Sequence, residues 1–420
     1  MIRLIRFVKL ICSRFGSISL ISEAAASYLG LFTGFIFNYL CLYLHGADTT
    51  GKFVYLLVFC NLIISLFVGW LDLIVVRSSS LLAKGLPLAC LIFLLLPSFL
   101  ASKLFFAFSS ADSTPLALPS VILYIIFSAY DSVASSLYIG LSKSSLLFRS
   151  AVVRSIFSIG GLVLLRANHD PAVILLVLVL SYICVIPMGW NSVGTNNIVK
   201  SFGDLCSLLL KSKSNFLSSL VSSPLSYIIN SYMLTNGAEY SQLAAYSTLL
   251  QWRKIPDTIN RSITRRTLAL VSTPNDYNLF RLKLIAICAS LFITVSLFLL
   301  SSWISLTFYP QLPGFEAGLQ RLCYIILISS FGIGFQFILY SHQLYRVGLF
   351  TNLLYVSIVI LCMPLMHIND VSELFNLLFA STFCNLVVSY LVLRKLFSLS
   401  EIVFVLTGST LVLTLYFNVF

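Results

Sequence analysis

Residues 171–190 read PAVILLVLVLSYICVIPMGW and contain no charged side chain. The hydrocarbon core of a bilayer is about 30 Å thick, so an α-helix needs about 20 mostly apolar residues to cross it. This stretch has that length and composition, and it therefore predicts a transmembrane helix. Similar runs recur along the chain, bounded by charged residues or by clusters of Gly, Pro and Asn.

The recurring apolar runs predict twelve transmembrane helices and a candidate thirteenth. The longest connection expected on the inner side, 191–214, separates six predicted helices from six. An even number makes both halves enter the membrane in the same direction, as in transporters built from parallel repeats. The twelve ranges are 20–44, 53–75, 86–107, 117–140, 150–166, 171–190, 215–235, 242–262, 284–308, 319–341, 348–367 and 372–393, and the candidate is 401–420.

These runs predict the fold class and the domain organisation. We expect an all-α polytopic membrane protein with two six-helix bundles related by a pseudo-two-fold axis. A faint sequence similarity supports the duplication, because HGADTTGKF at 45–53 aligns with NGAEYSQLA at 236–244 and pairs Gly46 with Gly237. The predicted parts are an N-terminal bundle at 1–195, a cytoplasmic linker at 196–214, a C-terminal bundle at 215–396 and the possible extra helix at 397–420.

The composition excludes water-soluble classes of protein. Of the 420 residues, 59% are hydrophobic and 10% are charged, and the mean hydropathy is +0.99. A water-soluble domain carries about 25% charged residues. This deficit excludes a cytosolic enzyme, a nucleic-acid-binding domain and a disordered chain, so we expect membrane lipids around the chain and no nucleic acid.

The net charge of +12 is interpreted as a topology signal. Cytoplasmic loops of membrane proteins collect Lys and Arg. With the N-terminus in the cytoplasm, the outer ends of the predicted helices carry only Lys52, Lys103, Arg166 and Arg321, and most other basic residues fall on the inner side. The sequence therefore predicts a cytoplasmic N-terminus.

The eighth predicted helix carries a charge deep in the membrane. Arg253 lies about 11 residues into this helix, about 16 Å along it at 1.5 Å per residue, which is near the midplane. A charge at that depth is costly and usually faces a cavity or a partner. Tyr246, Asp257 and Arg261 share the helix face of Arg253, because successive members are separated by seven, four and four residues.

The cationic stripe on this helix suits a substrate that carries phosphate, to which Arg offers a planar fork of donors. Pro256 removes one backbone donor and favours a kink in the helix. The alternative interpretation is an Arg253–Asp257 ion pair that only neutralises itself. Lys254 points to another side of the helix, where it either snorkels or pairs with another helix.

The fourth predicted helix carries an acidic residue near its centre. Asp131 is flanked by Ser128 and Ser135 at i−3 and i+4, with a tyrosine one further turn away on each side. An intramembrane polar stripe is expected to face inward. Asp131 is therefore a candidate for binding a coupling ion, H⁺ or Na⁺. The alternative is a structural counter-ion that neutralises Arg253 from across the bundle.

Three weaker candidates lie in the cytoplasmic third of the first two predicted helices. Glu23, Asp72 and Arg77 either line the inner mouth of a pathway or are ordinary interfacial residues. The sequence contains no GxxxxGK[ST] phosphate-binding loop, no HExxH, no GxSxG and no clustered metal-ligand set. We therefore expect no catalytic residue, no metal and no cofactor, and transport that runs on an ion gradient or downhill.

Three segments together resemble one family of transporters. They are GADTTGKF at 46–53, VGWLDLIVVRSSS at 68–80 and QWRKIPDTINRSITRRTLALVSTP at 251–274, combined with a basic N-terminus. Over about residues 15–395 the chain resembles the Wzx-type O-antigen flippases. These form a polysaccharide-transporter group of the multidrug/oligosaccharidyl-lipid/polysaccharide exporter superfamily.

This resemblance implies a flippase of the bacterial inner membrane that serves polysaccharide biosynthesis. The implied substrate is an oligosaccharide repeat unit on undecaprenyl diphosphate, moved from the cytoplasmic to the periplasmic leaflet by alternating access. The implied protein partners are a polysaccharide polymerase and a chain-length regulator. At the matching positions, Arg253 with Lys254 or Arg261 would attract the diphosphate.

Two other functions fit the same predicted fold. A cation-coupled exporter of drugs or metabolites would use the intramembrane carboxylate Asp131, but it explains less of the basic eighth helix. A membrane polymerase of the polysaccharide would generally carry a sizeable periplasmic loop with charged catalytic residues. The longest predicted external loop, 109–119, has only about a dozen residues.

Overall fold

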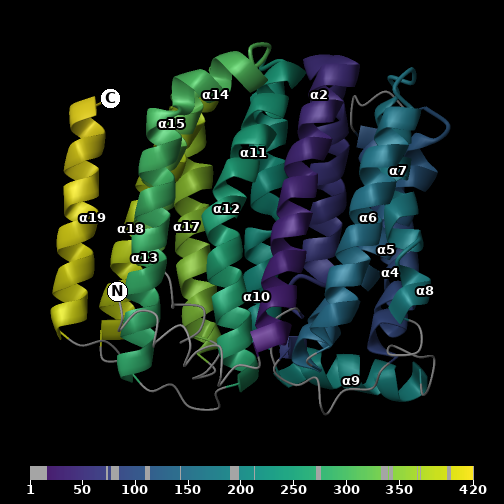
Figure 1. Cartoon of the computed structure of the whole chain (residues 1–420), viewed down its shortest axis with the longest axis horizontal. Coiled ribbons are helices and arrows are strands. Elements are labelled where there is room, and N and C mark those ends of the chain that lie inside the picture. The colour runs from purple at the N-terminus through teal and green to yellow at the C-terminus, as the bar shows by residue number, and fades with distance from the viewer. Residues whose placement is uncertain are drawn as a thin grey trace. The chain divides into compact units, whose positions relative to one another are not determined.

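The computed structural model describes residues 17–71, 74–76, 85–108, 114–141, 143–189, 198–211, 213–270, 276–332, 339, 344–366, 368, 370–394 and 399–419. Within these ranges all regular secondary structure is helical (Figure 1). A helix satisfies its internal backbone hydrogen bonds within one segment, which is what lipid requires. The predicted all-α polytopic membrane fold is confirmed.

The helices follow the predicted apolar runs in chain order. Each of the twelve predicted ranges overlaps one or more helices, α19 covers the candidate thirteenth, and α9 lies in the predicted linker. The bounds are α2 Ser17–Phe67, α4 Leu86–Phe108, α5 Ala117–Gly140, α6 Ser144–Leu164, α7 Pro171–Ile183, α8 Ile186–Gly189, α9 Ile198–Lys211, α10 Lys213–Ser222, α11 Pro224–Thr235, α12 Tyr240–Leu270, α13 Asp276–Leu299, α14 Ser301–Phe308, α15 Phe315–Phe331, α17 Tyr345–Leu365, α18 Val371–Leu393 and α19 Leu399–Val419.

A break inside α2 separates the first two predicted helices. Gly46 has φ +81° there, a left-handed conformation that glycine adopts without the steric penalty of other residues. Gly237, its aligned counterpart between α11 and α12, has φ +88°. The two aligned segments therefore share a backbone feature as well as a sequence similarity.

Seven helices among the described residues are long and apolar enough to cross a membrane, and the bent pair α13 and α14, whose axes meet at 60°, makes an eighth. The remaining predicted spans fall on helices that are shorter or more polar. For example, α11 has 12 residues, and α12 contains the sequence WRKIPD. Large apolar side chains are exposed on the helix surfaces, among them Tyr43 at 73% and Leu164 at 85%, as expected where lipid replaces water.

The chain divides into two compact units. The second part of α2 belongs to unit 2, whereas its first part belongs to unit 1. The predicted bundle boundaries near residues 195 and 215 stay a prediction. The described residues of unit 1 lie within Met1–Leu40, Phe67–Lys211 and Arg261–Leu270, and those of unit 2 lie within Cys41–Leu66, Ser212–Asn260 and Val271–Phe420.

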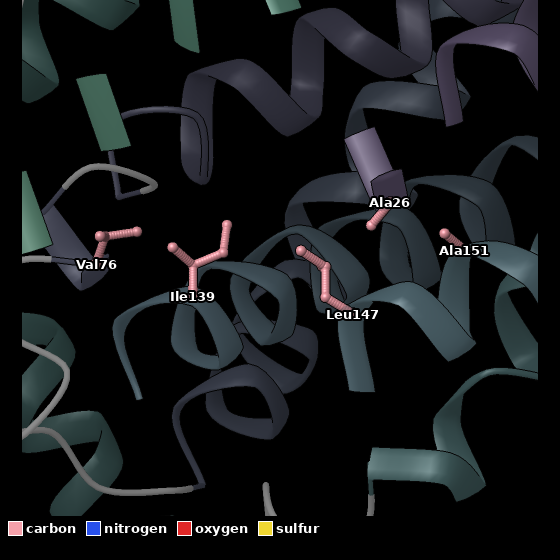
Figure 2. Close-up of a cluster of buried hydrophobic side chains, with 5 residues drawn as sticks. All are labelled: Ala26, Val76, Ile139, Leu147 and Ala151. Carbon is pink, nitrogen blue, oxygen red and sulfur yellow. The ribbon is translucent and has the colours of Figure 1, made fainter. Parts of the chain in front are cut away.

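The core of unit 1 forms where α5 packs against α4 and α7, and where α6 packs against α7. Hydroxyl groups join α2 to α6, with Thr33 and Ser155 oxygens 2.5 Å apart and a 2.7 Å hydrogen bond from Ser22 to Ser144. Small side chains let helix backbones approach closely, as is usual for packing in lipid. Figure 2 shows one buried hydrophobic cluster of this unit, in which Ala26 and Ala151 accompany the larger side chains of Val76, Ile139 and Leu147.

Unit 2 is built around α15 and α18, and α19 packs against both of them (Figure 1). Tyr416 of α19 stacks on Phe379 of α18 with ring centroids 3.9 Å apart. The Tyr416 hydroxyl also donates a hydrogen bond to the Asn376 side chain. The candidate thirteenth helix is therefore a packed component of unit 2.

Candidate functional site

A cavity of about 480 Å³ lies inside unit 2, and its walls come from α10, α11, α12, α15, α17 and α18. Small-molecule sites in proteins typically have volumes of about 300–1,000 Å³, so this cavity is large enough for one. The apolar and aromatic lining includes Leu225, Ile229, Tyr246, Leu250, Ile328, Tyr355, Leu378 and Leu386, and the polar lining includes Ser222, Ser226, Arg253, Ser329, Asn352, Thr382, Asn385 and Ser389.

Arg253 brings a positive charge to the wall of this cavity. It lies in α12, and its side chain is 27% exposed. Its Nε atom lies 3.7 Å from Oδ2 of Asp257, one turn further along the helix. This distance is longer than a hydrogen bond. The two opposite charges nevertheless form the ion pair that the alternative interpretation named, next to Pro256 inside the same helix.

Tyr246 lies two turns before Arg253 on α12. Its side chain is buried, and its ring packs against Phe375 of α18 with centroids 5.8 Å apart. Tyr246 and Arg253 both line the cavity, and Asp257 adjoins it through its contact with Arg253. Three of the residues that the sequence placed on one helix face thus lie together.

The other charged candidates are placed differently. Lys254 is exposed, donates a 3.1 Å hydrogen bond to Gln251 and does not line the cavity. Arg261 and Glu23 belong to α12 and α2, but their side chains lie outside the described residues. Asp72 and Arg77 lie entirely outside them.

Neutral polar residues form a wall of the cavity that the sequence did not lead us to predict. Thr382, Asn385 and Ser389 line it from α18 at steps of three and four residues, so they share one helix face. The Asn385 carboxamide oxygen and the Ser329 hydroxyl are buried and have no hydrogen-bond partner among the described residues. A polar stripe inside the apolar run 372–393 was the signal that could have revealed this wall.

Unit 1 holds a second polar site, around Asp131 of α5. Nη1 of Arg154, on α6, donates a hydrogen bond to Oδ2 of Asp131, and the side chains are 26% and 14% exposed, respectively. The Arg154 guanidinium also lies 5.5 Å from the ring centroid of Tyr182 on α7. Tyr182 meets Tyr124 edge to face at 5.8 Å. A carboxylate and an aromatic face both stabilise a cation, so the charges of this pair are balanced inside unit 1.

The position of Arg154 corrects an expectation. The sequence placed Arg154 near the cytoplasmic start of a helix over 150–166, but α6 begins at Ser144, which puts Arg154 near the middle of 21 helical residues. The predicted helix began directly after Arg149 because that basic residue interrupts the apolar run. Arg149 is exposed on α6, and an exposed basic residue does not end a helix. Asp131 is therefore partnered by a residue that was not considered as a site candidate.

Comparison with known proteins identifies the fold. No protein-family model matches the sequence, and no curated protein is similar to it in sequence. Solved structures are similar over nearly the whole chain. The eukaryotic MATE transporter AtDTX14 aligns with a TM-score of 0.67 and 12% identity, over 97% of this chain and 99% of its own. The chain has the MATE fold.

Other MATE structures agree with this result. MATE in complex with MaL6 aligns with a TM-score of 0.63 and 14% identity, over 90% of this chain and 95% of its own. The inward-facing conformation of a multidrug resistance MATE family transporter of the MOP superfamily aligns with a TM-score of 0.59 and 14% identity, over 89% and 94%. These structures share the fold at low sequence identity, and two of them are described as transporters.

The MATE neighbours overturn the resemblance to Wzx-type O-antigen flippases. The fold that matches most of this chain is that of multidrug transporters. The three segments behind the resemblance are short, and two of them include residues outside the described ranges. The apolar runs indicate how often a chain crosses the membrane and a basic N-terminus indicates its orientation, but neither indicates what its cavity binds.

Proposed function

We propose that the chain is a multi-pass membrane exporter of small organic molecules, coupled to a cation gradient. The observation that best supports this proposal is the cavity of about 480 Å³ in unit 2, within a fold shared with MATE transporters. Its wall combines aliphatic and aromatic side chains with a similar number of polar ones, so it suits a small molecule that has both an apolar and a polar part. The bacterial inner membrane, the cytoplasmic N-terminus and the polysaccharide-related partners stay predictions.

Alternating access would expose the cavity to one side of the membrane at a time. Pro256 lies three residues after Arg253 in α12. Proline removes a backbone hydrogen bond and clashes with the preceding turn, which weakens a helix locally. A bend of α12 at this point would move Arg253 relative to the other walls, so this part of α12 is our candidate for the segment that responds to substrate.

Asp131 in unit 1 is our candidate for the residue that binds the coupling cation. H⁺ or Na⁺ at this carboxylate would neutralise it and so compete with Arg154, its partner in the structure. Because Arg154 and the cation exclude each other at Asp131, this carboxylate has two states, and the cation concentration sets how much of each is populated. In the released state, the ring of Tyr182 would still accept the guanidinium.

Everted membrane vesicles test this proposal. Vesicles that contain the chain are given an outward or inward gradient of H⁺ or Na⁺, and the accumulation of fluorescent amphipathic compounds of both charge signs is measured. We expect accumulation that depends on the gradient and is lost in Asp131→Asn. The matched control is Asp48→Asn, because the Asp48 side chain is 68% exposed. Accumulation no greater than in vesicles without the chain, for every compound, contradicts the proposed function.

A further inference from the structure

The cavity of unit 2 has an uneven charge. Among its lining residues in the described part of the chain, Arg253 alone carries a formal charge, and no carboxylate lines the wall. A positive potential inside a low-dielectric cavity attracts anions and repels cations. The cavity is therefore complementary in sign to an anionic ligand.

The charge of Arg253 is only weakly compensated by the protein. Its Nε contacts Asp257 at 3.7 Å, and the Asp257 side chain is 40% exposed to its surroundings. Exposed ion pairs one helical turn apart interact weakly. The two terminal nitrogens of Arg253 have no hydrogen-bond partner among the described residues, and a guanidinium offers its donors as a planar fork that matches a carboxylate.

The other lining residues indicate which further groups a matching ligand carries. Leu250, Ile328 and Tyr355 give apolar and aromatic surface in the same cavity as Arg253. The buried Asn385 oxygen and the buried Ser329 hydroxyl lack partners among the described residues, and such groups gain most from a ligand that supplies a hydrogen bond. A matching ligand thus has an apolar body, one acidic group and a hydroxyl or amide group.

We infer that the cavity of unit 2 selects amphipathic organic anions, with Arg253 binding the acidic group and the Ser329 and Asn385 wall binding a neutral polar group. This inference rests on the proposed exporter function and names its substrate class. The selection is against cations as much as for anions, because a ligand ammonium would lie beside Arg253 with no carboxylate in the wall.

Three probes that share one apolar body and differ in charge separate the effect of ligand charge on affinity from the effect of ligand shape. They are 1-naphthylacetate, its neutral amide 1-naphthylacetamide and the cation 2-(1-naphthyl)ethylammonium. Their Kd values are measured by calorimetry with the purified full chain in detergent at neutral pH. We expect 1-naphthylacetate to bind at least about ten-fold more tightly than the amide, and the cation to bind more weakly than both, since charge-assisted hydrogen bonds are the stronger ones.

Substitution of Arg253 tests whether this residue causes the preference of the cavity for the anion over the neutral amide. Arg253→Gln should remove the advantage of the anion over the amide, and Arg253→Lys should keep part of it, because lysine retains the charge but not the fork. The matched control is Arg346→Gln, an exposed arginine of α17 that does not line the cavity. It should leave all three Kd values unchanged. If Arg253→Gln does not fold, the order of the three Kd values on the unaltered chain still tests whether the cavity selects anions.

Asn385→Leu tests the neutral polar group. It should leave the binding of 1-naphthylacetate within about two-fold, and it should abolish the gain in affinity that a ring hydroxyl on the same probe produces in the unaltered chain.

Transport of the same probes into everted vesicles separates this inference from the proposed function. Gradient-driven transport of the cation or the amide in preference to the anion overturns the selection of anions but leaves the exporter function standing. An anion preference that survives Arg253→Gln overturns the role of Arg253. Tight binding of the anion, lost in Arg253→Gln, together with no transport of any probe, supports the site and contradicts the exporter function.

Discussion

Asp131 and Arg154 each carry a charge that the interior of unit 1 tolerates because the other is present. We expect Arg154→Gln to lower the free energy of unfolding by about 3–5 kcal/mol, since it leaves a largely buried carboxylate without its partner. The double variant with Asp131→Asn should recover much of this loss, because no charge then remains unpaired. Thermal unfolding of the purified chain in detergent measures both changes.

Arg149→Gln is the matched control for this residue pair. Arg149 is exposed on the same helix, α6, so its substitution should change stability by no more than about 0.5 kcal/mol. Equal unfolding temperatures for Arg154→Gln and Arg149→Gln would mean that Asp131 does not depend on Arg154. The same result would remove the competition between Arg154 and a coupling cation.

At the scale of single helices, Gly51 allows α2 to approach α12 inside unit 2. A Cβ atom on Gly51 would lie 2.0 Å from the carbonyl oxygen of Tyr240, which is backbone and has no rotamer to change. We expect Gly51→Ala to force the second part of α2 away from the start of α12, at a cost of about 1–3 kcal/mol in the free energy of unfolding. Thermal unfolding in detergent is again the measurement.

The control for Gly51 lies on the same helix. A Cβ on Gly30 would meet nothing within 4 Å, so Gly30→Ala should be neutral or stabilise α2 by up to about 1 kcal/mol, because glycine is a weak helix former. If the two substitutions shift the unfolding temperature equally, the close approach of α2 to Tyr240 does not contribute to stability.

The C-terminal helix α19 depends on Tyr416 for its packing on α18. Tyr416→Phe keeps the ring stacked on Phe379 and removes the hydrogen bonds of the hydroxyl group with Asn376 and Arg321, so we expect a loss of at least about 1 kcal/mol. Tyr416→Ala removes both interactions and leaves a void, so we expect a loss of about 3 kcal/mol. Unfolding temperatures of the two variants should therefore differ. Identical values would show that the ring stack does not hold α19.

At the scale of the whole molecule, the sequence predicts the membrane-spanning helices and few of the contacts between them. The helices were predictable because a bilayer demands long apolar runs. Arg253 and Asp257 were predictable because charges inside such runs are rare, and Tyr246 because its spacing places it on the same helix face. The role of Arg154 depended on where α6 begins, and the Asn385 wall depended on how α18 packs. The MATE fold was not predictable from apolar runs that related transporters share.

The proposed function also requires that binding of a ligand in one unit changes the affinity of the other unit for its ligand. If a cation bound at Asp131 changes the affinity of the Arg253 cavity for substrate, the substrate changes the affinity for the cation by the same factor, which for allosteric proteins is typically about 5–150-fold. In an exporter that exchanges cation for substrate, the two ligands oppose each other. We therefore expect the Kd of 1-naphthylacetate to rise at least about five-fold at a saturating concentration of the coupling cation.

Asp131→Asn should remove this dependence and leave the anion preference of the cavity intact, whereas the exposed control Asp48→Asn should retain it. Calorimetric titrations at several cation concentrations measure the factor in both variants. Because reciprocity is thermodynamic, Na⁺ or H⁺ binding measured with and without the probe must give the same number. A Kd that is insensitive to both cations in the unaltered chain would contradict coupling through Asp131, even if the cavity binds anions as inferred.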